Sequence, residues 1–355
     1  MKKLIFSCLS IVILLNFGCT TEIVSETDVS ETPSSSVETT NSSTPSSTLG
    51  LDGVKYTMFI LNVHDWLNGN DSIETVNKVI DIHEKYEVPV NIYLTDPVVQ
   101  LYVEKAPDLI ERFKTSKYVT ISYHSRAPTP YYSNFDIIGI HELSDDEIYD
   151  KIMEYETHKI DLATGLPTES EGGYAYLKEI IGYAPVTVGI GSEYKNVETQ
   201  LMKVYKTLGA SFTLTHAKEA LLGDTKGGLY LRPEQIPIKL YESKALTSKG
   251  DEVIKSAISN YSGDTSKGEF INIKFHEDNF YLNGSPWIWN FYTDGQTSDP
   301  KSTPFDITTV NVKEKTDAER AHMWTLYEEA VEYVKDNSET MHPISEFDLE
   351  DMLSE

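Results

Sequence analysis

The chain has 355 residues, of which 39% are hydrophobic and 24% are charged, a balance that fits one large globular domain or two small ones. Its formal net charge of −26 at pH 7 would repel phosphates, which excludes nucleic acid as the expected partner. The two cysteines, Cys8 and Cys19, both lie near the N-terminus, so the rest of the sequence offers neither a disulfide nor a thiolate metal ligand.

The first 19 residues have the pattern of an export signal. A charged start, Met1-Lys2-Lys3, is followed by an apolar run at 4–17 that is too short to span a membrane but has the length of a signal-peptide core. The run leads to Gly18-Cys19, which resembles a bacterial lipoprotein signal, in which the cysteine is lipidated. We therefore predict a protein exported to the cell envelope or surface and anchored to a membrane through a lipid on Cys19. An ordinary secretory signal with a chance cysteine is the alternative.

Residues 20–51 have a different composition from the rest of the chain. They are mainly Ser, Thr, Glu and Pro, and cannot bury enough apolar surface to offset their chain entropy. We predict a disordered tether at 20–51 and a folded domain at 52–355.

Within the folded domain, segments with a strand pattern alternate with segments of helical periodicity. Asp71 with Glu74, and Ser144 with Glu147, have capping-box spacing, and Pro107 predicts a break in the second helix. The expected strands are 56–63, 88–94, 118–124, 183–190, 210–216, 229–231 with 236–240, and 270–276. The expected helices are 71–86, 98–113, 144–164, 197–208, 253–261 and 317–335.

This alternation implies parallel strands joined by right-handed crossovers. No glycine-rich phosphate loop follows the first strand, which disfavours a dinucleotide-binding sheet. We therefore predict an α/β fold, a distorted (β/α) barrel of about seven parallel strands.

Several expected strands end in residues that can bind a metal or carry a proton. His64 and Asp65 follow the first strand, and three other strands end at His124, His216 and His276. The carboxyl ends of barrel strands form one ring, so these side chains can converge. Histidine and aspartate are ligands of zinc and similar ions, which make bound water a nucleophile near neutral pH.

The order of these motifs resembles the polysaccharide deacetylase superfamily (the NodB homology domain, or carbohydrate esterase family 4), a distorted barrel of about seven strands. The similarity extends over 56–353. It rests on 60–66 (ILNVHDW), 84–94 (EKYEVPVNIYL), 121–125 (ISYHS), 143–148 (LSDDEI) and 271–276 (INIKFH).

The resemblance implies a hydrolase that uses a divalent metal, expected to be zinc, to remove acetyl groups from a polysaccharide or other glycan. Carried over by position, Asp65 and His124 would be metal ligands and His276 the general acid. His64 stands where the family has its catalytic base.

Four departures from the family pattern leave alternatives open. The family's arginine-containing third motif and its Asp-rich fourth motif are not visible in this sequence. The family has an aspartate where this chain has His64, and its second metal-binding histidine falls on Pro128. A replacement ligand could be His64, His141, His216 or Glu171. If His64 binds the metal, the base must come from elsewhere. A lipoprotein that binds glycan without catalysis is the second hypothesis, and a surface lipoprotein that contacts only other proteins is the third.

Four further residues are expected to contact the substrate. Trp287 and Trp289 can stack on a sugar ring, and Arg126 can hold a carboxylate or sulfate. Tyr174 ends the segment Glu171-Gly172-Gly173-Tyr174, which lies roughly in the place of the family's third motif. Local packing of the two tryptophans and a salt bridge for Arg126 are the structural alternatives.

Overall fold

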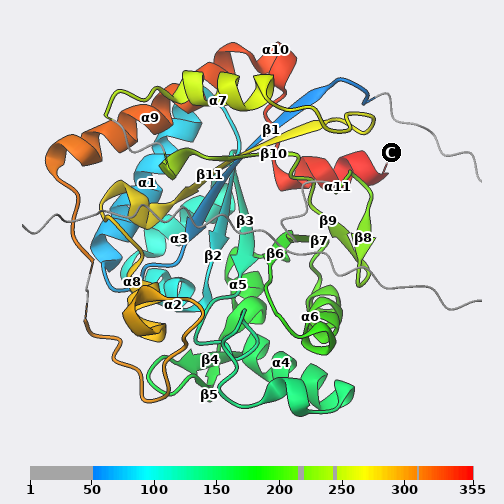
Figure 1. Ribbon diagram of the computed structural model, residues 1–355, viewed down its shortest axis with the longest axis vertical. Coiled ribbons are helices and arrows are strands. Elements are labelled where there is room, and N and C mark those ends of the chain that lie inside the picture. The colour runs from blue at the N-terminus through cyan, green and yellow to red at the C-terminus, as the bar shows by residue number, and fades with distance from the viewer. Residues whose placement is uncertain (1–50, 215–219, 243–245, 310–311, 355) are drawn as a thin grey trace, which may run out of the picture. The chain divides into compact units, whose positions relative to one another are not determined.

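A nine-stranded sheet forms the centre of the folded part of the chain (Figure 1). The computed structural model describes residues 51–214, 220–242, 246–309 and 312–354, so the predicted signal, most of the tether and His216 lie outside the described residues. In order across the sheet, the strands are β10 (Ile236–Lys239), β11 (Glu269–His276), β1 (Lys55–Val63), β2 (Val90–Leu94), β3 (Val119–His124), β6 (Thr187–Gly189), β7 (Phe212–Leu214), β9 (Leu229–Leu231) and β8 (Thr225–Lys226).

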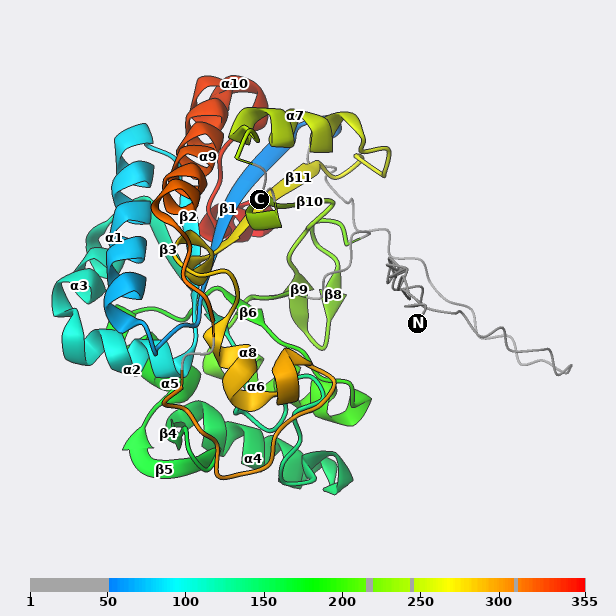
Figure 2. The same cartoon turned by 60° about the vertical axis from the view of Figure 1, so that its left-hand side comes forward.

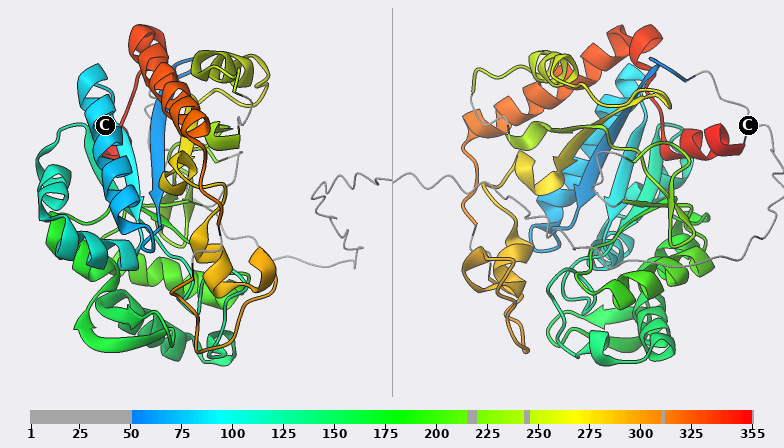
Figure 3. Two further views of the ribbon diagram at one scale, coloured as in Figure 1. Left: turned by 90° about the vertical axis from the view of Figure 1, so that its left-hand side faces the viewer. Right: turned by 45° about the vertical axis from the view of Figure 1, so that its right-hand side comes forward.

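All neighbouring strands run parallel except β8 and β9. The sheet curls, as Figure 3 shows, but no pairing joins β10 to β8 within the described residues, so the barrel is open on that side. The predicted distorted (β/α) barrel is confirmed. The segments 229–231 and 236–240, which were expected to form one strand, are two separate strands. β10 is the first strand of the order and β9 is the last but one, and the short connection 232–235 joins them.

Helices cover the outside of the curled sheet, and Figure 2 shows α1 and α9 packed side by side. Among the described residues, no helix is both long and apolar enough to cross a membrane. The helices are α1 (Gly69–Tyr86), α2 (Asp96–Lys105), α3 (Pro107–Thr115), α4 (Asp145–Thr157), α5 (Gly173–Ile181), α6 (Lys195–Leu208), α7 (Gly250–Ser259), α8 (Pro286–Phe291), α9 (Asp317–Asp336), α10 (Ser338–Met341) and α11 (Glu346–Ser354).

The predicted helix boundaries are partly correct. The break at Pro107 separates α2 from α3, and Ser144 and Glu147 form the predicted capping box of α4. The Asp71 cap is wrong, because α1 already begins at Gly69 after Asn68. The helix expected to reach residue 164 ends at Thr157. The chain then forms the antiparallel hairpin of β4 (His158–Asp161) and β5 (Leu166–Glu171), whose turn uses Gly165 at φ +69°.

The two faces of the central strands differ in polarity because side chains alternate along a strand. On β1 the outward residues Phe59, Leu61 and Val63 belong to the main hydrophobic core, together with residues of α1 and α9. The inward faces of β1, β2, β3 and β11 carry buried polar residues, namely Asn62, Asn91, Ser122, Asn272 and Lys274. The inner face is therefore mixed: Met58 and Phe270 belong to a second apolar cluster, and polar residues continue to the carboxyl-terminal rim.

A buried ion-pair network lies between the 232–235 connection and α11. Arg232, which is 2% exposed, donates to Glu346 (3.2 Å) and lies 3.6 Å from Glu234. Glu346 also accepts hydrogen bonds from the hydroxyls of Tyr93 on β2 and Ser122 on β3. These contacts tie the connection and α11 to the inner face of the sheet.

A buried histidine joins α1 to α9. Nδ1 of His83 donates to the carbonyl of Val88 (2.8 Å), and in the neutral ring Nε2 accepts from the hydroxyl of Tyr327 (2.7 Å). Burial lowers the pKa of His83 from 6.5 to about 4. The unfolded chain therefore binds a proton between pH 6.5 and pH 4 that the folded protein does not bind, and stability falls as the pH falls through this window.

We expect the difference in unfolding free energy between wild type and His83→Gln to narrow by about 3 kcal/mol between pH 7 and pH 4, since glutamine does not titrate. Urea denaturation of both proteins across this range measures the difference. A difference that does not change with pH would contradict the buried neutral histidine.

Candidate metal site and pocket

The order of the strands brings two of the predicted histidines together. β11 pairs directly with β1, and the register places His276 opposite Asn62, two residues before His64. His64 and His276 both lie on the inner side of the sheet, and their rings meet edge to face with centroids 5.2 Å apart. His124 ends β3, which is separated from β1 by β2. Parallel pairing thus places His276 beside His64 and leaves His124 two strands away.

His64, His276 and Asp278 form a group that can hold a metal ion. One ligand atom from each residue lies within 4.8 Å of the other two, and no other such group of three exists in the described part of the chain. His64 is 1% exposed and Asp278 is fully buried. Neither ring nitrogen of His64 has a hydrogen-bond partner, and Oδ1 of Asp278 also lacks one. Such buried polar atoms cost free energy unless a ligand satisfies them.

The two histidines of this group are neutral. Burial, with a smaller contribution from the positive charge of Arg126, holds the pKa of His64 well below its usual value and lowers the pKa of His276 to about 3. Nδ1 of His64 is 3.9 Å from Asp278, so a neutral ring at this distance makes neither a salt bridge nor a hydrogen bond. Neutral imidazole is the form that binds a metal.

Three buried carboxyl groups crowd the same place. Burial, with repulsion from neighbouring carboxylates, raises the pKa of Glu277 well above its usual value, and burial together with repulsion from Asp65 raises the pKa of Asp278 to about 7. Oε1 of Glu277 accepts from the backbone N–H groups of His64 (2.7 Å) and Asp65 (2.5 Å), which fixes the end of β1 against β11. A cation bound here would offset this concentration of negative charge.

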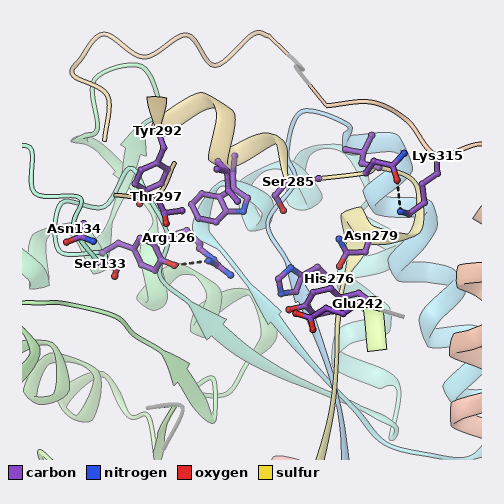
Figure 4. Close-up of a pocket in the computed structure, with 17 residues that line it drawn as sticks. Arg126, Ser133, Asn134, Glu242, His276, Asn279, Ser285, Tyr292, Thr297 and Lys315 are labelled. Atoms are coloured by element: carbon purple, nitrogen blue, oxygen red, sulfur yellow. Dashed lines mark hydrogen bonds between the residues drawn. The ribbon is translucent and has the colours of Figure 1, made fainter. Parts of the chain in front are cut away.

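The group lies at one side of a cavity of about 510 Å³, into which His276 projects (Figure 4). Arg126 lies over the indole ring of Trp287, 4.7 Å from its centroid, and donates to the hydroxyl of Tyr132 at 2.8 Å. Tyr241 stacks on His276 with ring centroids 4.9 Å apart. The side-chain amides and hydroxyls of Asn134, Asn279, Asn283, Ser285 and Thr297 complete the polar part of the lining.

Asp65 does not face this cavity, which corrects its predicted place among the metal ligands. Its Oδ1 accepts from the N–H groups of Leu67 (3.0 Å) and Asn68 (3.2 Å). Its Oδ2 accepts from the Asn68 amide (3.0 Å) and the Tyr281 hydroxyl (2.9 Å). Because four donors already occupy the two oxygens, Asp65 holds the turn after β1.

His124, the other predicted ligand, is also outside the group. Its Nδ1 donates to the carbonyl of Ser125 (2.8 Å), and its ring packs against Gly189, where an added Cβ would be 3.1 Å away. It borders a separate cavity of about 10 Å³ together with Pro128, the position expected for the family's second histidine. His124 belongs to no group of three ligand residues among the described residues.

Of the proposed replacement ligands, the described residues leave only His64 in the group. His141 bonds Asp136 through Nδ1 (2.6 Å) and stacks on Tyr194, and Glu171 is exposed on β5. His216 lies outside the described residues.

Of the four predicted substrate-binding residues, two line the large cavity and two do not. Arg126 and Trp287 line the large cavity, and Trp289, which is 36% exposed, does not. The predicted substrate contact of Tyr174 is wrong, because this residue is fully buried in the core and donates to the carbonyl of Pro185 (2.7 Å).

The sequence analysis missed Glu277 and Asp278, which complete the site directly after β11. The signal was present in His276-Glu277-Asp278, where two carboxylates follow a histidine that ends a strand. It also missed Tyr241 and Ser285. The hydroxyl of Ser285 donates to Oδ2 of Asp278. No local pattern marks either of these two residues.

No family model and no curated protein matches this sequence. Among solved structures, the chain is similar to a 4-alpha-glucanotransferase from Thermococcus litoralis, with 14% identity over 67% of this chain and 36% of that chain, and a TM-score of 0.38. It is similar to the peptidoglycan deacetylase PdaC from Bacillus subtilis, with 12% identity over 85% and 92% of the two chains and a TM-score of 0.39. It is also similar to a CE4 family pseudoenzyme from Bacillus anthracis, with 12% identity over 63% and 57% and a TM-score of 0.33.

Members of the deacetylase superfamily, to which the sequence motifs point, are thus among the structural matches. At these identities and TM-scores the matches assign no activity and no residue role. The chemistry of the site rests on its own geometry.

We expect Asp65→Ala to lower the free energy of unfolding by about 2–4 kcal/mol, because the buried Tyr281 hydroxyl and the backbone N–H groups of the turn lose their acceptor. Asn68→Ala, which removes one donor to the same carboxylate, is the control and should cost about 1 kcal/mol. Denaturation combined with zinc titration of the folded variants checks both points. Lost zinc binding at unchanged stability would make Asp65 a ligand after all.

Proposed function

We propose that this protein is a metal-dependent carbohydrate esterase that removes acetyl groups from a glycan. The observation that carries the proposal is the buried group His64, His276 and Asp278, with both nitrogens of His64 unpartnered, beside a cavity of about 510 Å³. The resemblance of the sequence motifs points to an acetylated glycan as the substrate. The volume of the cavity is suited to small ligands.

The donor set fits a zinc ion. Two neutral imidazoles and one carboxylate are the ligands of hydrolytic zinc sites, which keep a further position open. When bound there, zinc lowers the pKa of water so that hydroxide is available near neutral pH and polarises an ester or amide carbonyl. His64 takes the place of the ligand that the family pattern loses at Pro128.

Surrounding residues hold these three side chains in position. The Ser285 hydroxyl donates to Oδ2 of Asp278. Oδ1 of Asp278 has no hydrogen-bond partner and is available to a metal ion. Glu277 binds the backbone of His64 and Asp65, and Tyr241 restrains the ring of His276 by stacking. Such supporting contacts orient ligands and tune their basicity.

The lining of the cavity suits a sugar. The partly exposed ring of Tyr241 can cover the apolar side of a pyranose ring, and the amides and hydroxyls of the lining can bond its hydroxyl groups. An extended glycan would enter from the open side, where His276 is partly exposed.

A second function, glycan binding without turnover, is supported by one observation. With His64 and His276 both in the ligand group, neither is free to act as the base or the acid that the family resemblance assigns to them. Measurement of acetate release separates the two functions.

We also propose export and anchoring through a lipid on Cys19, on the basis of the apolar run at 4–17 and the Gly18-Cys19 pair. Cys19→Ser should move the protein from the membrane fraction to the soluble exported fraction. Unchanged fractionation of the variant would contradict the anchor.

We expect Asp278→Asn to weaken zinc binding by at least about ten-fold and to abolish acetate release, because the amide is a poorer ligand of nearly the same shape. Asp96→Asn is the matched control: Asp96 is 4% exposed, lies outside the group and accepts from the N–H of Gly173 (2.8 Å). Zinc calorimetry and an acetate assay on acetylated oligosaccharides measure both effects.

Equal zinc affinity of the wild-type and Asp278→Asn proteins would overturn the ligand assignment. Stoichiometric zinc with bound oligosaccharide but no acetate released would favour the non-catalytic glycan-binding function.

A further inference from the structure

Arg126 occupies an unusual position for a charged residue. Its guanidinium lies over the Trp287 ring at 4.7 Å and is held by the Tyr132 hydroxyl at 2.8 Å, so its orientation is fixed by two partners that carry no negative charge. Its Nε is buried and has no hydrogen-bond partner. No carboxylate among the described residues lies within ion-pair distance of this guanidinium.

The other arginines behave differently. The sequence has four arginines, and each of the remaining three pairs with two carboxylates: Arg112 with Asp81 and Glu84, Arg232 with Glu234 and Glu346, and Arg320 with Asp71 and Glu314. The chain has 56 acidic residues for 30 basic ones, so a carboxylate partner is easy to provide. A salt bridge within the protein therefore does not account for Arg126.

Few carboxylates line the cavity around Arg126. Glu242 is the one carboxylate residue that lines it within the described ranges, and its Oε1 lies 3.3 Å from the ammonium of Lys239. Lys315 lines the same cavity and donates to Asn283 at 3.1 Å. Figure 4 shows Arg126 and His276 in the middle of the cavity, between Asn134 on the left and Lys315 on the right.

We propose that the glycan bound in this cavity carries a carboxylate and that Arg126 is the residue that receives it, which makes an acidic sugar the substrate class. This inference rests on the proposed function for the acetyl group, but the carboxylate contact itself needs no catalysis. The planar guanidinium fork matches a carboxylate with two parallel hydrogen bonds, and stacking on Trp287 prepares it for that geometry. Partial exclusion of water strengthens the interaction.

Two kinds of sugar present this chemistry: uronic acids, whose carboxylate is on the ring, and muramic acid, whose carboxylate is on a lactyl ether. The test uses acetylated oligosaccharides of both kinds, each compared with its own methyl ester, which has the same shape but no charge. Isothermal titration calorimetry on the zinc-loaded full chain measures the affinities.

We expect the wild-type protein to bind one of the two acids about 30-fold more tightly than its methyl ester, and that acid identifies the source of the carboxylate. Arg126→Met should reduce this preference to within about three-fold, and Arg126→Lys, which keeps the charge without the fork, should retain an intermediate preference. Tyr132→Phe removes only the hydroxyl that holds Arg126 and should lower the preference by about three-fold. Because this change is small, it serves as a control for misfolding of the Arg126 variants.

Equal affinity for acid and ester with both kinds of sugar would overturn the inference. So would a charge preference that survives in Arg126→Met. An effect of Arg126→Met on kcat for neutral esters, without any charge preference in binding, would assign Arg126 to the reaction instead and overturn the proposal.

Failure of the proposed function gives a different result. If the wild-type protein prefers the acid but releases no acetate, the carboxylate site stands and the esterase does not. If it releases acetate from acid and ester alike, with equal affinity, the esterase stands and the carboxylate site does not.

Discussion

The site depends on the parallel pairing of β11 with β1. Parallel strands end at the same edge of a sheet, and alternation assigns every second residue to the inner face. The register of Asn62 with His276 therefore brings two histidines, 212 positions apart along the chain, into edge-to-face contact on the polar side of the barrel. The residue after His64 follows the opposite parity, so Asp65 points away and holds a turn.

Burial then determines what this pair of histidines can do. It keeps both rings neutral and, together with repulsion among the carboxyl groups, raises the pKa values of Glu277 and Asp278. Replacing such a buried ionisable group by apolar residues of similar volume is often neutral or stabilising in proteins. A cation bound here would satisfy one of the two unpartnered nitrogens of His64 and offset the charge of the carboxylates. The same logic applies to Arg126, which lacks a protein carboxylate in a chain rich in them.

The sequence predicts the fold better than the site. The segments that end at His64, His124 and His276 have a clear strand pattern, so local sequence is enough to find β1, β3 and β11. The order in which strands pair is set by tertiary packing, and this order decides that His276, and not His124, is next to His64. Position-by-position transfer from the family therefore chose Asp65, although the parity of side chains along β1 already disfavours it. Tyr241 and Ser285 reach the site from distant loops, and no spacing rule reveals them.

The most direct test of this account is an anomalous difference map, recorded at the zinc absorption edge, from crystals of the protein grown with zinc. The account predicts one strong peak within bonding distance, about 2.0–2.2 Å, of His64, His276 and Asp278. A peak bound instead by Asp65 and His124, or no peak at saturating zinc, would contradict it.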